Sequence, residues 1–418
     1  MNKKIGNLFK GDKVIWMVFF FLCMISIVEV FSASSGLTYK SQNYVGPIAY
    51  HTFTIFLGVL AAIVTLNVPC RYFKLLTPFL LLLSGLMLLI VMLGGGESTN
   101  DASRWIRLGP FTIQPSEIAK GTIVLMVAQI LAAMQRENGA DRKAFKYIMW
   151  FTIPACMAIG VENLSTAALL FGVVFLMMFI GLVPMRQLGK LFAVIAFMGI
   201  FAISMVMIVG HDRSEEEGQQ LTKTELIEKN KKKSKLEKML HRADTWKARI
   251  LKFGKPKPTP KEYDLDKDAQ VAHANIAIVS SGITGKGPGK STERDFLAQA
   301  FSDFIFAIVI EELGIIGATA VVFLYIILLY RCARIASRCE NNFPAFLAMG
   351  LGLLLVIQAT FNMMVAVGLA PVTGQPLPLI SKGGTSTIIN CVYIGAILSV
   401  SRSAKVKKDV QEVKKLRS

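Results

Sequence analysis

Long apolar runs alternate with short polar loops along nearly the whole chain. Ten runs carry few charged side chains, and they lie at 14–33, 50–67, 74–93, 115–134, 147–161, 164–182, 188–209, 303–330, 344–367 and 386–401. An apolar helix of about 20 residues spans the hydrocarbon core of a bilayer. Backbone groups in lipid must be satisfied within their own segment, which favours helices. The pattern predicts an all-α, polytopic membrane protein with about ten transmembrane helices and almost no strand.

The fifth and sixth runs leave two alternatives open. The fifth is short and contains Pro154, and only Glu162 and Asn163 separate it from the sixth. The two runs are either separate spans or one broken pair that dips through the membrane.

Basic residues set the expected orientation. Lysine and arginine gather in one alternate set of loops and in the tail 402–418, whereas the other set holds little besides Lys40, Arg104, Arg107 and Lys382. Cytoplasmic loops carry the excess of basic residues, so both termini are expected in the cytoplasm. The outer loops are then 34–49, 94–114, 162–163, 210–302 and 368–385.

One outer loop, 210–302, is much longer than the others. Its part 214–268 is polar and lysine-rich, and it is either a charged surface helix with a linker or a docking site for a partner or for anionic headgroups. Its part 272–291 is apolar and then glycine-rich, which fits a phosphate cradle or a re-entrant turn. We expect the whole chain, 1–418, to form a single membrane domain that includes this loop and the basic tail.

Composition narrows the function classes. The chain of 418 residues is 53% hydrophobic and has a net charge of +18, but the positive charge lies in loops and tails, so no nucleic-acid partner is indicated. Six cysteines include no C-x-x-C pair, which argues against structural zinc and a disulfide framework.

Asp303 is the main candidate for chemistry. It opens the run Phe301–Gly317, in which only Glu311 and Glu312 otherwise interrupt the apolar pattern. A carboxylate at the edge of a bilayer costs free energy, so its presence there indicates a function. On an ideal helix Glu311 lies within about 80° of Asp303 and Glu312 points roughly away, so the three acids cannot serve one site from a straight helix. We expect the glutamates either to cap or to pair internally.

Two further polar stretches flank apolar runs. Pro115 suits a helix start, and Glu117 and Lys120 are spaced to pair on one helix face. They form either an interfacial ion pair or part of a polar cavity. The segment 371–386 is rich in proline and glycine and contains Lys382 and Ser386, and it either lines a cavity or forms a surface loop.

These stretches, in this order, resemble the SEDS family (shape, elongation, division and sporulation) of bacterial membrane proteins, which comprises FtsW, RodA and SpoVE. The matching runs are Ser32–Ser34, Arg104–Ile106, Gln114–Glu117 with Lys120, Ser281-Gly282 with Gly285–Gly287, Asp303–Ala307 with Glu311–Gly314, Pro371–Gly374, and Pro376–Ser381 with Gly383-Gly384. The sequence departs from the family pattern at Lys382, where a tyrosine is usual. The run Pro376–Leu379 with Gly383–Ser386 is more similar to the division branch.

The resemblance implies ten membrane helices and polymerisation of lipid II into glycan strands at the outer face of the bacterial cytoplasmic membrane. It implies that Asp303 is the essential acid and that Glu117 and Lys120 line the pocket. It also implies a class B penicillin-binding protein, a transpeptidase, as partner, together with other membrane proteins of the division machinery.

The chemistry needs one general base and cations for a diphosphate leaving group. We assign the base to Asp303 and expect Glu117, Lys120, Arg104, Lys382 and Ser386 to bind substrate. We assign no cofactor and no metal site, and leave open a divalent cation, Mg²⁺ or Mn²⁺, that would suit the leaving group. The rival functions are a lipid flippase or transporter, a non-enzymatic scaffold, and a role in elongation instead of division.

Overall fold

The computed structural model describes residues 10–41, 46–93, 97–99, 102–108, 111–137, 139–209, 269–297 and 300–415. The chain divides into two units, one formed by Met1–Met185 with Leu265–Ser418 and the other by Arg186–Asp264. The described part of the second unit is 186–209, which is all of α8 (Met185–Val209) except its first residue. The predicted surface helix in 214–268 lies outside the described residues.

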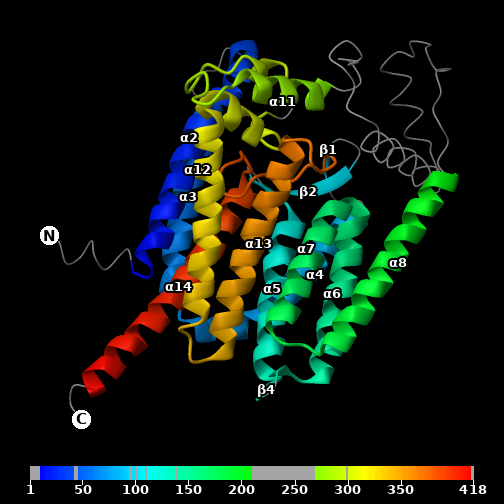
Figure 1. The fold of residues 1–418 in the computed structure, drawn as a ribbon, viewed down its shortest axis with the longest axis vertical. Coiled ribbons are helices and arrows are strands. Elements are labelled where there is room, and N and C mark those ends of the chain that lie inside the picture. Colours follow the sequence, from blue (N-terminus) through cyan, green and yellow to red (C-terminus); the bar gives the residue numbers. More distant parts are fainter. Residues whose placement is uncertain are drawn as a thin grey trace. The chain divides into compact units, whose positions relative to one another are not determined.

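The first unit is a bundle of helices (Figure 1). These are α2 (Lys13–Ser41), α3 (Gly46–Asn67), α4 (Cys70–Met92), α5 (Pro115–Ala133), α6 (Arg142–Glu162), α7 (Leu164–Ile180), α12 (Ile305–Ala336), α13 (Asn342–Ala366) and α14 (Thr385–Lys415). Among the described residues, eight helices are long and apolar enough to cross a membrane, and α7 is a shorter apolar helix. With α8, every predicted apolar run is helical, so the predicted fold class is confirmed.

The fifth and sixth runs form two separate helices. α6 is 21 residues long and accommodates Pro154, and its apolar part 142–161 meets the length of a full span. Asn163 ends α6 and begins α7, because its side chain accepts a hydrogen bond from the Thr166 N–H at 3.2 Å. The two runs are therefore distinct helices that meet at Asn163.

Short strands occur in the loops, contrary to the expectation of almost none. β1 (Glu97–Thr99), β2 (Ala102–Leu108) and β3 (Phe111–Ile113) form an antiparallel sheet, with Ile106 opposite Ile113. β4 (Gln135–Arg136) and β5 (Gly139–Ala140) form a second pair. These strands lie in polar connections, where hairpins can pair their backbone outside the lipid.

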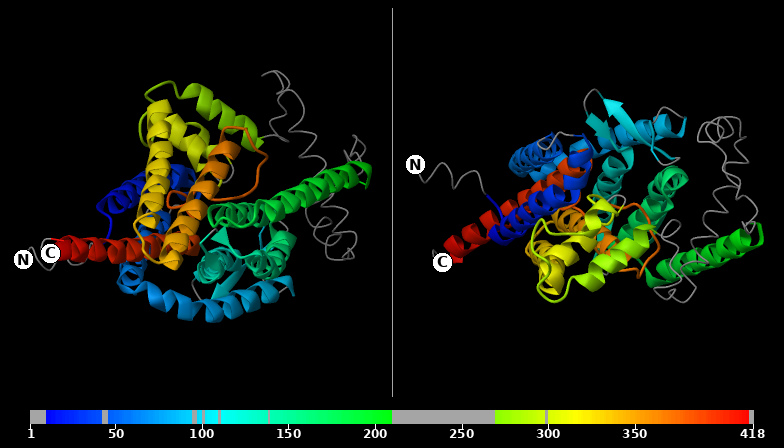
Figure 2. Two further views of the ribbon diagram at one scale, coloured as in Figure 1. Left: turned by 60° about the horizontal axis from the view of Figure 1, so that its bottom comes forward. Right: turned by 90° about the horizontal axis from the view of Figure 1, so that it is seen from above.

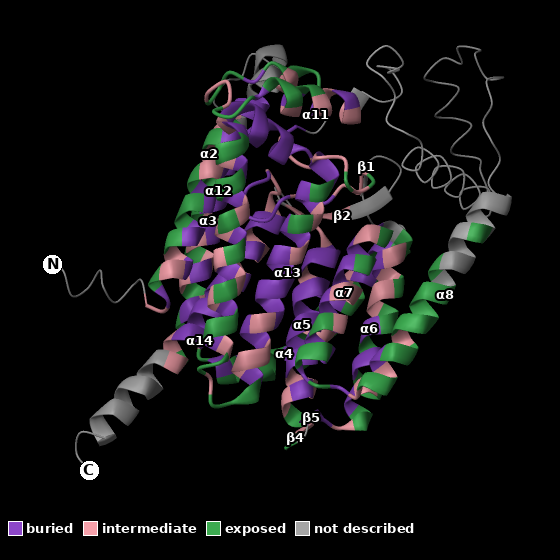
Figure 3. Cartoon of the chain, viewed as in Figure 1, coloured by how far each residue is buried: buried purple, intermediate pink, exposed green. Residues whose placement is uncertain are grey.

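The core lies around α5 and α13, whose buried faces are visible in Figure 3. α13 packs against α5, α7 and α12, and the views of Figure 2 show α12 and α13 side by side. α3 and α14 approach closely because glycines face the partner helix: a Cβ at Gly58 would lie 2.7 Å from the Cys391 Sγ atom. Small residues commonly permit such approaches between membrane helices.

The last part of the long loop 210–302 is folded. It contains α11 (Ala269–Ser280) and the 3₁₀ turn η1 (Glu293–Asp295), and both contact the first unit's helices α12 or α2. Figure 1 shows α11 at the end of the bundle opposite to the C-terminal part of α14. The predicted tail 402–418 continues α14 as helix up to Lys415.

Candidate functional site

Asp303 precedes α12 and is not part of it. The predicted span began at 303, but the helix begins at Ile305, after a turn, and it is interrupted at Gly314 (φ 70°, ψ −172°). The geometry of a straight helix from Asp303 to Glu311 therefore does not apply. The side chain of Asp303 is partly exposed, and its Oδ1 atom accepts a hydrogen bond from the Ser302 hydroxyl at 3.0 Å.

The backbone around Asp303 is held by the irregular segment 371–384. Lys382 N–H donates to the Phe301 carbonyl at 2.9 Å, and the Ser381 hydroxyl donates to the Ser302 carbonyl at 2.6 Å. Asn362 on α13 donates to the Asp303 carbonyl at 2.8 Å. The backbone of Asp303 and of the two residues before it is thus fixed by two other parts of the chain.

Lys382 lies beside the acid-bearing turn. Its ammonium sits 5.1 Å from the centre of the Phe301 ring, a cation–π contact. Among the described residues, no carboxylate forms an ion pair with Lys382. Burial lowers the pKa of the Lys382 ammonium below its ordinary value. The site therefore presents a partly desolvated cation that no described carboxylate neutralises.

Glu117 and Lys120 form the expected ion pair on α5. Their side chains are almost fully buried and lie 2.8 Å apart, and the Lys120 ammonium also donates to the Gln358 side-chain oxygen at 2.7 Å. The second carboxylate oxygen of Glu117 has no hydrogen-bond partner among the described residues. A buried charge pair in a membrane helix is costly unless it is satisfied or used.

Two polar residues of α13 join these groups. Gln358 and Asn362 lie four residues apart and so share one helix face. Gln358 contacts Lys120 and donates to the Pro376 carbonyl at 3.2 Å, while Asn362 donates to the Gln375 carbonyl at 2.6 Å as well as to Asp303. The ion pair, the irregular segment and the acid therefore belong to one connected polar network.

The remaining candidate residues have different positions. Ser386 lies in the first turn of α14 and is buried, and its hydroxyl has no partner among the described residues. Arg104 lies on β2, but its side chain falls outside what the structure describes. Thr385 links α14 to the sheet by donating to the Thr112 carbonyl at 2.6 Å.

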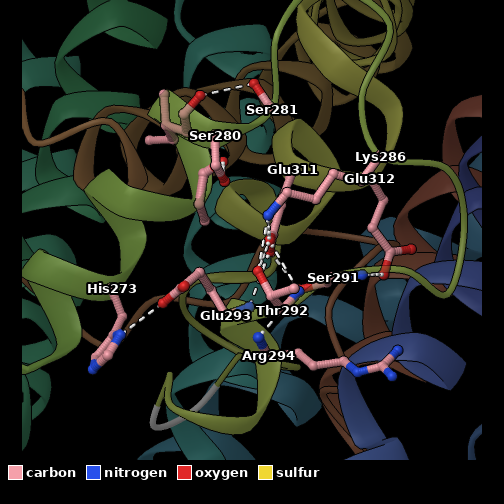
Figure 4. A network of polar contacts seen from close by, with 12 residues as sticks. His273, Ser280, Ser281, Lys286, Ser291, Thr292, Glu293, Arg294, Glu311 and Glu312 are labelled. Atoms are coloured by element: carbon pink, nitrogen blue, oxygen red, sulfur yellow. Dashed lines mark hydrogen bonds and ion pairs between the residues drawn. The ribbon is translucent and has the colours of Figure 1, made fainter.

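Glu311 and Glu312 hold the glycine-rich loop, as Figure 4 shows. Glu311 accepts hydrogen bonds from the Lys286 ammonium at 2.6 Å and from the Thr292 N–H at 3.0 Å. Glu312 accepts from the Gly289 N–H at 2.8 Å and from the Ser291 N–H at 3.1 Å. The loop does cradle anions, but they are carboxylates of the same chain, and the expected internal pairing of the glutamates is confirmed.

The contact between this loop and α12 depends on two glycines. A Cβ at Gly285 would lie 2.2 Å from the Glu312 carbonyl oxygen, and one at Gly314 would lie 2.2 Å from the Ile283 carbonyl oxygen. Both residues have positive φ values. The interruption of α12 therefore coincides with the docking of the loop.

The sequence analysis missed Gln358 and Asn362. The signal was present, because both interrupt the apolar run 344–367 at helical spacing. As for a metal, no group of three or more His, Cys, Asp or Glu side chains in the described part of the chain is arranged to hold one.

The fold and the site define a polytopic helical membrane protein whose polar network surrounds an acid before a membrane helix. Comparison with protein families gives a match over residues 12–406 to the FtsW/RodA/SpoVE family, described as "cell cycle protein". The chain belongs to this family.

Related proteins match over nearly their full length. The chain is 30% identical over 399 residues to a probable peptidoglycan glycosyltransferase FtsW of Geobacter metallireducens, covering 94% of this chain and 95% of the relative. It is 27% identical over 398 residues to the stage V sporulation protein E of Bacillus subtilis, covering 94% and 98%.

Solved structures share the fold. One is a chain of a peptidoglycan synthase complex that coordinates polymerization and crosslinking, with a TM-score of 0.67, 22% identity, and coverage of 94% of this chain and 98% of that chain. Another is the rod shape determining protein RodA of Thermus thermophilus, with a TM-score of 0.61, 21% identity, and coverage of 95% and 98%.

Proposed function

We propose that this protein is a peptidoglycan glycosyltransferase that polymerises lipid II into glycan strands during cell division. The observation that carries the proposal is Asp303, a partly exposed acid whose backbone is fixed by α13 and by the segment 371–384. The names of the full-length relatives support the same activity.

Asp303 acts as the general base. The sugar hydroxyl of an acceptor lipid II gives its proton to the carboxylate while its oxygen attacks the anomeric carbon of the donor. The donor's bond to its lipid diphosphate breaks, and the configuration at that carbon inverts. A base contributes about 10²–10⁴-fold to such a step if it lies within hydrogen-bond reach. The hydrogen bond from Ser302 orients the carboxylate.

Cations near the acid stabilise the leaving diphosphate. Lys382 is the best placed of them, because no described carboxylate neutralises it and because it borders the acid-bearing turn. Lys120 is tied to Glu117 and Gln358, so it shapes the network beneath the site and contributes less free charge. Ser386 and Arg104 complete the proposed substrate-binding set. The described residues include no group of three or more His, Cys, Asp or Glu side chains arranged to hold an Mg²⁺ or Mn²⁺ ion, so no step is assigned to one.

We propose that the reaction takes place at the outer face of the bacterial cytoplasmic membrane and that both termini lie in the cytoplasm. The distribution of basic residues supports this orientation. We further propose a class B penicillin-binding protein as partner, since a solved relative of the fold belongs to a complex that couples polymerization with crosslinking.

The test is polymerisation of lipid II by the purified protein together with a class B transpeptidase. Asp303→Asn keeps the shape and removes the base, so we expect the rate to fall at least about 100-fold. Asp295→Asn, in η1, is the matched control and should retain activity. Equal activity of wild type and Asp303→Asn would exclude the proposed base. No polymer from the wild type beside an active control enzyme would point to a transporter or a scaffold.

A further inference from the structure

Two polar residues inside the apolar helices α2 and α3 have no part in the chemistry above. Ser26 on α2 is fully buried, and His51 on α3 is only 2% exposed. The His51 Nε2 atom lies 2.9 Å from the Ser26 hydroxyl, which donates to the Ile380 carbonyl at 2.7 Å. The pair therefore connects two membrane helices to the irregular segment beside Asp303.

The direction of these hydrogen bonds follows from the donor count. A serine hydroxyl has a single proton, and at Ser26 that proton goes to the Ile380 carbonyl. The Ser26 oxygen must then accept from His51, so the His51 Nε2 atom carries a hydrogen. The result is a relay that runs from His51 through Ser26 to Ile380.

The relay holds one side of the three-residue segment 380–382, called the strip below. Ile380 is bonded by Ser26, whereas the next two residues, Ser381 and Lys382, are bonded to the carbonyls of Ser302 and Phe301. The strip is thus fixed between the α2–α3 pair and the turn that carries Asp303. His51 also lies close enough to Lys382 to experience its charge.

We infer that Ser26 and His51 are positioning residues, which fix the Lys382 ammonium where it binds the anionic diphosphate of the lipid substrate. The inference rests on the proposed function, because it assumes that the diphosphate lies at Lys382. Without the relay, the strip loses its hydrogen bond to α2 and is held only by the turn that carries Asp303. The Lys382 ammonium then leaves the Phe301 ring more often. The charge then stabilises the leaving group less, although the base is untouched.

The first measurement is enzymatic. Ser26→Ala and His51→Leu should lower kcat/KM for lipid II polymerisation by about tenfold, the effect of roughly one hydrogen bond. His51→Gln keeps an N–H donor at a similar reach and should restore most of the loss. Thr54→Val is the control, because the buried Thr54 hydroxyl on α3 donates to the Tyr50 carbonyl of its own helix at 2.8 Å and has no other partner among the described residues.

Lys382→Gln separates positioning from general damage. In a Lys382→Gln background, Ser26→Ala should cause no further loss of kcat/KM, because the charge that it positions is gone. An undiminished loss in this background would overturn the inference.

The second measurement does not require activity. The rate at which an amine-acylating ester labels Lys382, followed by peptide mass spectrometry at one pH, reports how firmly the strip is held. We expect several-fold faster labelling in Ser26→Ala and His51→Leu, and unchanged labelling in His51→Gln and Thr54→Val. Labelling of Ser26→Ala and His51→Leu at the wild-type rate would refute the relay. A wild type that makes no polymer would refute the proposed function, while the labelling would still decide the relay.

Discussion

Replacing Lys120 by methionine tests the buried network most directly. The methionine keeps the apolar stem but leaves the Glu117 carboxylate without its cation, at a site where Glu117 is 1% exposed. The second Glu117 oxygen already lacks a partner among the described residues. The Gln358 oxygen also loses its donor. The variant therefore isolates one buried charge and one buried acceptor.

The expected loss is large. Breaking one partner of a buried ion pair costs about 3–5 kcal/mol of unfolding free energy. The unsatisfied Gln358 oxygen adds about 1 kcal/mol. Converting Glu117 to glutamine in the same chain removes the isolated charge, so the double variant should lie within about 1–2 kcal/mol of the wild type.

The assay is reversible unfolding of the purified protein in mixed micelles, with the free energy of unfolding compared across the four members of the cycle. Thr122→Val is a control on the same helix, since the Thr122 hydroxyl donates to the Ile118 carbonyl at 2.8 Å and to no other described residue. A single variant Lys120→Met as stable as the double variant would refute the reasoning, because the carboxylate would then carry no buried charge.

Three further outcomes follow from the structure. Gly285→Ala should destabilise the glycine-rich loop by about 2 kcal/mol or more, seen as faster limited proteolysis, because its Cβ meets a backbone carbonyl of α12. Gly282→Ala is the control: its Cβ meets no atom within 4 Å, and it should cost about 1 kcal/mol. Burial lowers the pKa of Lys382, so the rate of polymerisation should fall as pH rises through that lowered pKa and the ammonium loses its charge. Over the same pH range the contribution of Lys382 to the free energy of unfolding should rise, because the buried charge is removed. Lys382→Arg, which stays charged, should extend activity to higher pH. Burial alone would raise the pKa of Asp12, but the ion pair with Arg331 and the hydrogen bonds from Arg331 and from backbone N–H groups outweigh burial and lower this pKa. The stability that Asp12 provides is therefore present above its ordinary pKa and is lost as pH falls through the lowered pKa. Asp12→Ala should cost about 2 kcal/mol of unfolding free energy, measured by thermal unfolding.

The sequence allowed the helices to be predicted because hydrophobic length alone defines a span. The ion pair of Glu117 and Lys120 was also predictable, since it depends on local helical spacing. The start of α12 was not, because the turn at Asp303 is held by Asn362, Ser381 and Lys382, which are distant in the chain.

The contacts of Ser26 and His51 were unpredictable for the same reason. Ser26 donates to Ile380, which lies more than 300 residues away and contributes only a backbone carbonyl that no side-chain pattern reveals. His51 bonds to Ser26 on the neighbouring helix, a contact that depends on how α2 and α3 dock. The interruption at Gly314 likewise depends on the close approach of a loop. Spacing within one element was informative, and docking between elements was not.

The pairing of the glycine-rich loop with Glu311 and Glu312 has a consequence for how the chain is made. The loop precedes both acids in the sequence, so the ribosome completes their hydrogen-bond donors first. We expect the donors to be already across the bilayer when α12 enters it. Each carboxylate would then find its hydrogen-bond donors already in place when α12 inserts. This order of synthesis would avoid an insertion intermediate in which the two carboxylates are unpaired in lipid.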